Sequence, residues 1–288
     1  MRTPDERFAG LRDFPYSPRY LQWRDWRAHY VEEGGGNRTW LCLHGEPTWS
    51  YLYRRMIPRF LQSGGRVVAP DFIGFGRSDK PEDDALYTFD FHRAFLLELV
   101  ERQDLRNITL VVQDWGGVLG LTLPMEMPER FERLLVMNTT LATGDFPLPE
   151  GFVAWRAYVA KNPDLACGKL MARTCPHLTP EEAAAYDAPF PDIRYKTGAR
   201  RFPQLVPEHR GDPGAALCRQ ARQWLKDAWK GESFMAIGMK DPVLGPPVMT
   251  ELRSCIRNCP PPYPVENGGH FLQEWGDEVA AAAIEHWS

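Results

Sequence analysis

Residues 110–120 read LVVQDWGGVLG and place an ionisable carboxylate at the end of an apolar run, with two glycines close behind it. A strand, a tight turn carrying one functional side chain and a following helix form a nucleophile elbow. This turn raises the side chain above the sheet, beside backbone N–H groups. The raised residue here is Asp114. Val112 stands where the general motif has glycine, and an aspartate that only caps a helix is the alternative explanation.

A carboxylate nucleophile forms an ester, which a base-activated water must then hydrolyse. His270, in VENGGHFLQEWG, follows the last expected strand in a glycine-rich turn that can hold an imidazole over the sheet edge. Asp241, in AIGMKDPVLGPP, comes just beyond a strand. The order nucleophile, acid, histidine is that of a known type of triad, so Asp241 is predicted to orient His270. An isolated Asp-Pro turn is the alternative for Asp241.

Other residues of these types receive structural interpretations. Asn138, at the alternative position for the acid after RLLVMN, cannot hold a negative charge against an imidazolium. His44 is expected to order the loop after its strand, and His92 and His286 to be surface or packing residues of helices.

The stretch HGEPTWSYLYRRM contains a His-Gly-x-Pro turn, from which such folds present a backbone N–H to an oxyanion. The N–H groups of Glu46 and Trp115 are the predicted oxyanion pair.

Elements that must position these residues are visible as short runs rich in Val, Ile and Leu between longer helical patterns. The runs predict strands at 39–45, 66–71, 107–114, 133–138, 233–238 and 263–267. Alternating strands and helices indicate a mostly parallel sheet covered on both faces. An antiparallel hairpin is expected before them, around LQWRDWRAHYVEE and its GGG turn. The helical pattern over 88–104 has Thr88 as its candidate N-cap.

The alternation breaks down between Gly144 and Pro213, where prolines separate short helical pieces, and it resumes at Ala215. We interpret 144–213 as a helical cap inserted between two segments of one core, 1–143 and 214–288. In open α/β sheets the ligand lies beyond the carboxyl ends of the strands. A cap at that end would cover the site.

Composition excludes several classes of function. The net charge of −4 and the scattered Lys and Arg provide no basic stripe, which argues against nucleic acid as a partner. The chain has neither a long apolar run nor an apolar signal-peptide centre, so no membrane partner is expected and a cytoplasmic location is predicted. The six cysteines are expected to be reduced thiols. No His/Cys cluster has zinc spacing, so no metal is implied.

These motifs together resemble the haloalkane dehalogenases. The resemblance covers most of the chain and rests on HGEPTWSYLYRRM, DFIGFGRSDKP, VVQDWGG with LGLTLPM, GFVAWRAY, AAYDAPFPD, AIGMKDPVLGPPVM and GGHFLQEWG. It is closest to the branch with Glu after His-Gly, a late acid and a cap tryptophan. It implies an α/β-hydrolase fold with a helical cap, and an aspartate that displaces halide from carbon. A small apolar haloalkane, water and halide are then the reaction partners, and neither an organic cofactor nor a metal is needed.

A departing halide needs donors that bring no competing negative charge. Indole N–H groups suit this, and Trp115 adjoins the nucleophile. Glu46, when ionised, is acceptor-only, so the second donor must come from elsewhere. The resemblance assigns that role to Trp155 in GFVAWRAY. It also implies apolar lining positions at Phe152, Phe202, Pro203 and Phe271.

Two other functions stay open at this point. An epoxide hydrolase shares the aspartate and histidine but protonates the opening oxygen with cap tyrosines, for which Tyr158, Tyr186 and Tyr195 are available. The paired tryptophans weigh against it, because an alkoxide needs a proton and a halide does not. A receptor that kept the fold and only binds small molecules is the other alternative. The intact nucleophile, acid and base argue against it.

Overall fold

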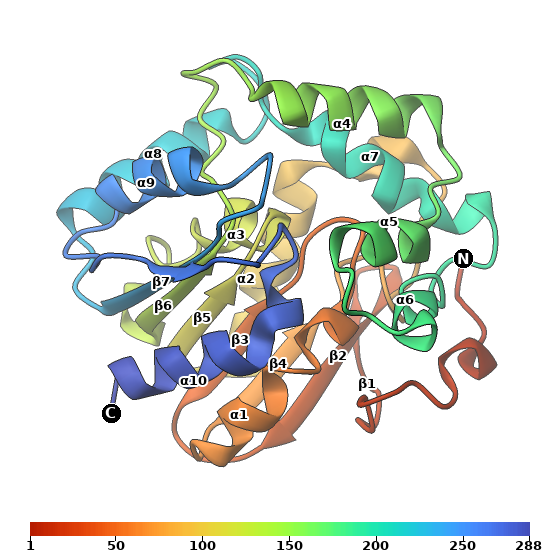
Figure 1. Cartoon of the computed structure of the whole chain (residues 1–288), viewed down its shortest axis with the longest axis horizontal. Coiled ribbons are helices and arrows are strands. Elements are labelled where there is room, and N and C mark those ends of the chain that lie inside the picture. The colour runs from red at the N-terminus through yellow and green to blue at the C-terminus, as the bar shows by residue number, and fades with distance from the viewer.

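An eight-stranded sheet forms the centre of the computed structural model, which describes residues 1–288 (Figure 1). The strands lie in the order β1-β2-β4-β3-β5-β6-β7-β8. The first pairings, β1 with β2 and β2 with β4, are antiparallel, and all others are parallel. The parallel strands are β3 (Thr39–Leu43), β4 (Arg66–Pro70), β5 (Ile108–Val112), β6 (Phe131–Met137), β7 (Glu232–Gly238) and β8 (Tyr263–Val265). The predicted mostly parallel sheet is confirmed.

The leading hairpin is present, but the predicted position of its turn is wrong. Strands β1 (Arg19–Trp23) and β2 (Trp26–Gly34) pair up to Trp23 opposite Trp26, so the turn consists of Arg24 and Asp25. Arg24 has a φ of 50°, the backbone region that such two-residue turns require. The glycines at 34–36 instead end β2, whose other edge pairs with β4.

Helices cover both faces of the sheet. Figure 1 shows α1 and α10 together in front of it and α2 and α3 behind it, and each pair is in contact. Thr88 accepts a hydrogen bond from the Phe91 N–H at the start of α2, which confirms the predicted N-cap. The helices that flank the sheet are α1 (Ile57–Gln62), α2 (Phe89–Arg102), α3 (Trp115–Gly120), α8 (Ala215–Asp227), α9 (Pro246–Ser254) and α10 (Gly276–His286).

The core lies along the central strands. Every residue of β3 and β5 is buried, as expected for parallel strands covered on both faces. All six cysteines are free and buried. No helix has the length and apolar character needed to cross a bilayer.

Four α-helices lie between β6 and α8 in the chain: α4 (Glu150–Lys161), α5 (Cys167–Thr174), α6 (Pro180–Ala185) and α7 (Thr197–Leu205). Helix α4 packs on α7, and α5 packs on α6. A capping box between Thr179 and Glu182 starts α6. In Figure 1 these helices lie beyond the sheet, and residues of α4 line the same cavity as Asp114. They therefore cover the C-terminal end of β5, which Asp114 follows.

Candidate active site

Asp114 occupies the sharp turn between β5 and α3. Its φ of 49° and ψ of −128° lie in a region that side-chain-bearing residues rarely adopt. The close approach around it depends on small residues, because a Cβ on Gly116 would collide with the Leu43 carbonyl, and one on Gly45 with the Asp114 carboxylate. The Asp114 side chain caps no N–H of α3. A simple N-cap role therefore does not explain this aspartate.

Asp114, Asp241 and His270 come together at one place. The Nδ1 atom of His270 is 2.8 Å from Asp241 Oδ2, and its Nε2 atom is 3.5 Å from Asp114 Oδ2. The Asp241 side chain is fully buried and also accepts a hydrogen bond from the Val243 N–H at 2.8 Å. Each of the three residues follows a strand in a short turn. The imidazole consequently lies between two carboxylates.

Asn138 supports this acid. Its Nδ2 donates to Asp241 Oδ2 at 2.9 Å, and its Oδ1 accepts from the Gly238 N–H at 2.7 Å. The sequence argument dismissed Asn138 only as a charged partner and missed this positioning role. The available signal was an amide side chain directly after β6, next to the strand that leads to Asp241.

The charges of Asp114 and Asp241 shift the pKa of His270, and His270 in turn shifts that of Asp241. Burial opposes charging of the imidazole, but Asp241 and Asp114 outweigh it and raise the pKa of His270 to about 10. Burial likewise opposes ionisation of Asp241, yet His270 holds the pKa of this carboxyl below its usual value. The positive charge on His270 thus depends on both carboxylates. Loss of the charge on Asp114 would lower the pKa of His270.

Gln113, directly before the nucleophile, was not identified from the sequence. It is fully buried, and its Nε2 donates to the His270 carbonyl at 3.0 Å. The same amide nitrogen lies 3.0 Å from His270 Nε2. A polar residue at the end of the otherwise apolar β5 was the signal that could have identified it.

The backbone N–H of Glu46, the first predicted oxyanion donor, donates to Asp114 Oδ1 at 2.9 Å. Trp115, whose N–H is the second predicted oxyanion donor, is the first residue of α3. The Glu46 side chain is buried, and its Oε1 has no hydrogen-bond partner. Burial and the charge of Asp114 raise the pKa of Glu46 well above its usual value, although the Trp155 indole offsets part of the rise. The surroundings of this carboxyl therefore disfavour the ionised, acceptor-only form that the sequence analysis considered.

A cavity of about 440 Å³ opens above these groups. Trp115 and Trp155 both line it, as do the carboxylate of Asp114 and the ring of His270. Of the expected apolar positions, Phe152, Pro203 and Phe271 line it as well. Phe202 differs, because it is fully buried and packs its ring against Trp115 at 4.9 Å between centroids. It lies behind the cavity wall and supports one of the two indoles.

Comparison with known proteins agrees with this site. The model of the alpha/beta hydrolase fold family matches residues 40–277. A haloalkane dehalogenase of Psychrobacter cryohalolentis is 41% identical over 296 residues, which cover 99% of this chain and 97% of that protein. The chain belongs to the haloalkane dehalogenase family. A second haloalkane dehalogenase, from Mycolicibacterium paratuberculosis, is 40% identical and spans 100% of this chain and 97% of its own.

Solved structures of haloalkane dehalogenases are similar over the whole fold. The enzyme DpaA of Paraglaciecola agarilytica, described as tetrameric, has a TM-score of 0.97 and 50% identity, with 99% of this chain and 97% of that chain covered. DatA of Agrobacterium tumefaciens has a TM-score of 0.78 and 26% identity, with 99% and 98% covered. The cap helices are included in these matches, so this haloalkane dehalogenase shares the whole architecture with its relatives.

Proposed function

We propose that this haloalkane dehalogenase converts short halogenated alkanes to alcohol and halide through an ester on Asp114. One observation carries the proposal. Asp114 has one oxygen on the Glu46 N–H and the other 3.5 Å from the His270 imidazole, in a cavity lined by two indoles. A held carboxylate, a base beside it and neutral donors for an anion are what displacement and hydrolysis need.

In the first step Asp114 Oδ2 attacks the halogen-bearing carbon. A carbon–oxygen bond forms as the carbon–halogen bond breaks, and the halide leaves with the bonding electron pair. The indole N–H groups of Trp115 and Trp155 donate to this halide. Because indole is uncharged, it stabilises the departing anion and leaves the attacking carboxylate free.

In the second step a neutral His270 takes a proton from water through Nε2, and the hydroxide attacks the carboxyl carbon of the ester. The N–H groups of Glu46 and Trp115 stabilise the oxyanion on Oδ1. The bond between the carboxyl carbon and the alkyl oxygen then breaks, His270 returns its proton to that oxygen, and the alcohol leaves. The carboxylic acid that remains loses a proton to solvent, which restores the Asp114 carboxylate. Esterification removes the charge of Asp114, which contributes to the high pKa of His270. Alkylation therefore favours release of the imidazole proton to solvent and prepares the base for this step.

The substrate class follows from the cavity. Its volume of about 440 Å³ suits a small molecule, and Phe152, Pro203 and Phe271 give it apolar walls. We propose residues 144–213 as the cap that carries the upper wall, inserted between core segments 1–143 and 214–288. The cytoplasmic location and the absence of a nucleic-acid partner stay predictions.

An epoxide hydrolase is less well supported. That reaction needs cap tyrosines at the cavity to protonate the opening oxygen. Of the three available tyrosines, only Tyr158 lines the cavity, whereas Tyr186 donates to Glu274 elsewhere in the structure. Tyr195 lies in a turn outside the cavity lining.

Halide release from a panel of short bromo- and chloroalkanes, measured beside diol formation from a panel of short epoxides, tests the proposal. We expect halide release with several bromoalkanes and no diol from the epoxides. Diol formation without halide release would overturn the proposal in favour of the epoxide reaction. Binding of both panels without turnover would favour the receptor.

A further inference from the structure

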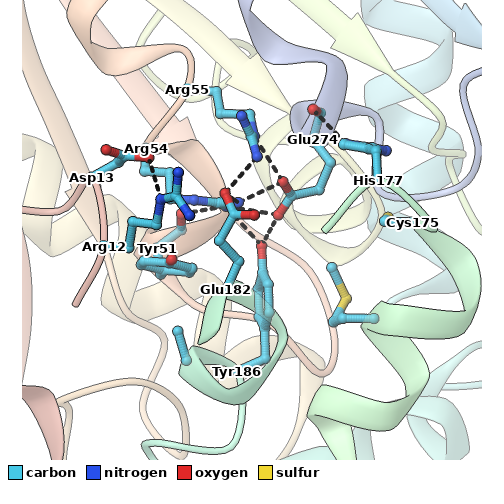
Figure 2. Close-up of polar contacts among 12 residues, drawn as sticks. Arg12, Asp13, Tyr51, Arg54, Arg55, Cys175, His177, Glu182, Tyr186 and Glu274 are labelled. Carbon is cyan, nitrogen blue, oxygen red and sulfur yellow. Dashed lines mark hydrogen bonds and ion pairs between the residues drawn. The ribbon is translucent and has the colours of Figure 1, made fainter. Parts of the chain in front are cut away.

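Five side chains form a largely buried cluster of charged and polar groups (Figure 2). The members of this group, called the Arg54 cluster below, are Arg54, Arg55, Glu182, Tyr186 and Glu274. None of them lines the catalytic cavity. The cluster therefore takes no direct part in the proposed chemistry, and its presence needs a separate explanation.

Arg54 is at the centre of the cluster. Its two terminal nitrogens donate to the two carboxylate oxygens of Glu274 at 2.7 and 2.8 Å, and one of them also donates to Glu182 at 3.1 Å. Arg55 bridges the same two carboxylates at 2.6 and 3.1 Å. The side chains of Arg54 and Glu274 are 0% exposed. Two guanidinium groups thus balance two carboxylates, and only Arg55, with a side chain 27% exposed, reaches solvent to a sizeable extent.

The members come from three segments, two of which carry groups of the active site. Arg54 and Arg55 follow the turn of residues Ser50–Tyr53, in the connection after β3 that also contains the oxyanion residue Glu46. Glu274 lies in the turn Leu272–Trp275, directly after His270 and Phe271. The other two members belong to α6 and its end. The cluster therefore joins the oxyanion segment, the histidine segment and the cap.

Glu274 is held through its main chain as well as its side chain. Its N–H donates to the Phe271 carbonyl at 3.0 Å, and the His270 carbonyl accepts from the Leu272 N–H at 3.0 Å. Its own carbonyl is 3.1 Å from His177 Nε2, which lies between α5 and α6. Tyr186 donates to its carboxylate, and burial raises the pKa of this phenol well above its usual value, so Tyr186 remains a donor. Displacement of Glu274 would move the turn that carries the base.

Stability alone does not account for the cluster. Desolvation of buried ions consumes most of their attraction, and apolar replacements of similar volume are often as stable. Bidentate guanidinium–carboxylate pairs instead impose a narrow geometry on the segments that they join. The feature that the Arg54 cluster supplies is thus a defined distance between the segments of Glu46 and His270.

We propose that the Arg54 cluster is a positioning device for His270, which sets the imidazole against the ester only while α6 is seated on the core. This inference rests on the proposed role of His270 as the base. It predicts that the cluster acts on ester hydrolysis and leaves carbon–halogen cleavage nearly unaffected. Cleavage depends on Asp114 and the two indoles, to which the cluster is not bonded.

Tyr186→Phe tests the proposal, because it removes one hydroxyl from the cluster and no charge. In single turnovers of a bromoalkane followed by rapid quench, we expect bromide to form within about twofold of the native rate. Alcohol should form about tenfold more slowly, because a misplacement of about 1 Å costs up to about 100-fold. Intact-mass spectra should show the ester on a larger fraction of the enzyme.

Asp277→Asn is the matched control. Asp277 pairs with Arg59 at 2.8 Å and joins α10 to α1, the core helices adjacent to the same segments, but the pair is exposed and does not reach the cap. This variant should show native rates for both steps. If Tyr186→Phe does not fold, Arg55→Gln provides the second variant, because Arg55 is at the 27% exposed edge of the cluster. It should show the same selective loss.

Unchanged alcohol formation in a folded Tyr186→Phe variant with a lowered melting temperature would reduce the cluster to a structural feature and overturn the inference. An equal fall in both steps would also overturn it. Failure of the proposed function itself is distinguishable, since a His270→Gln variant would then accumulate no ester. An ester in His270→Gln together with native rates in Tyr186→Phe would reject the positioning role alone.

Discussion

The core and the cap hold their halves of the active site in different ways. On the core side, Asp114, Asp241 and His270 are connected by hydrogen bonds and ion pairs to Glu46, Gln113 and Asn138. On the cap side, α4 presents Phe152, Trp155 and Tyr158 to the cavity, and Val159 is its only buried residue. Val153 and Tyr158 are among the exposed large apolar side chains of the chain. The catalytic groups of the core half are fixed by directional bonds, whereas α4, which carries the cap residues of the cavity, is largely exposed.

This difference suggests a division of labour. Bond formation and hydrolysis require atoms held within a fraction of an ångström, which directional bonds between buried groups provide. Substrate choice needs only an apolar wall of suitable shape. Changes in the core half should therefore stop a chemical step, whereas changes in α4 should weaken halide binding and alter substrate preference.

The largest expected effect comes from the core half. Asp114→Ala removes the nucleophile, so halide release should fall by more than about 10⁴-fold. Circular dichroism should show a folded protein, because the alanine side chain fits inside the volume of the aspartate. Steady-state halide release from 1-bromobutane is the measurement. Activity above a few per cent of native would contradict a carboxylate nucleophile at this position.

An intermediate effect is expected in the cap half. Trp155→Phe keeps an aromatic ring but removes one N–H donor to the halide, worth about 1.5–3 kcal/mol as a bond to a charged group. Bromide formation in a single turnover should slow by about one to two decades. Added bromide should quench tryptophan fluorescence saturably in the native enzyme and more weakly in the variant.

Trp224→Phe is the control for that experiment. Trp224 lies in α8, 6.1 Å from the ring of Trp229 and outside the cavity lining. Its replacement should leave the saturable quenching nearly unchanged. Native bromide affinity and native turnover in Trp155→Phe would show that the second halide donor is another group.

The smallest expected effect is the pH dependence of the stability that the ion pairs of His270 contribute to the core half. A pKa of His270 raised from 6.5 to about 10 stabilises the fold fully below pH 6.5, and this contribution is lost as the pH rises through about 10. The melting temperature of His270→Gln should therefore be furthest below native near pH 6. The gap should narrow by a few degrees toward pH 10, because about 1 kcal/mol corresponds to about 2 °C in a chain of this size.

His286→Gln is the control for the pH series, because His286 is an exposed residue at the end of α10. Its melting temperature should follow that of the native protein at every pH. A gap between native and His270→Gln that stays constant from pH 6 to pH 10 would contradict the ion pairing of His270.

Sequence reasoning works for the residues whose position is local. Asp114, Asp241 and His270 each follow an apolar run in a short turn, and parallel strands bring such turns to one edge of the sheet. Trp155 has no comparable local signal. It lies within helix α4, away from any strand end, and only the family resemblance identified it. The predicted hairpin turn failed because a run of glycines is a stronger turn signal than Arg24 and Asp25.

The bonding partners of the supporting residues could not be predicted, because these partners lie far away in the chain. Asn138 meets Asp241 across 103 residues only through the pairing of β6 with β7. Arg54 meets Glu274 across 220 residues and Glu182 across 128 residues. No spacing rule connects positions so distant. Such contacts can be identified only once the register of the strands and the position of the cap on the core are known.

The central claim is that Asp114 forms an ester which His270 removes, and trapping that ester tests it most directly. His270→Gln keeps the nucleophile and both indoles but lacks the base. With a bromoalkane it should release about one bromide per enzyme and then stop, because a carboxylate is already ionised at neutral pH. Peptide mass spectrometry should then find the alkyl group on Asp114. A variant that shows neither the single release nor an alkyl group on Asp114 would contradict the account.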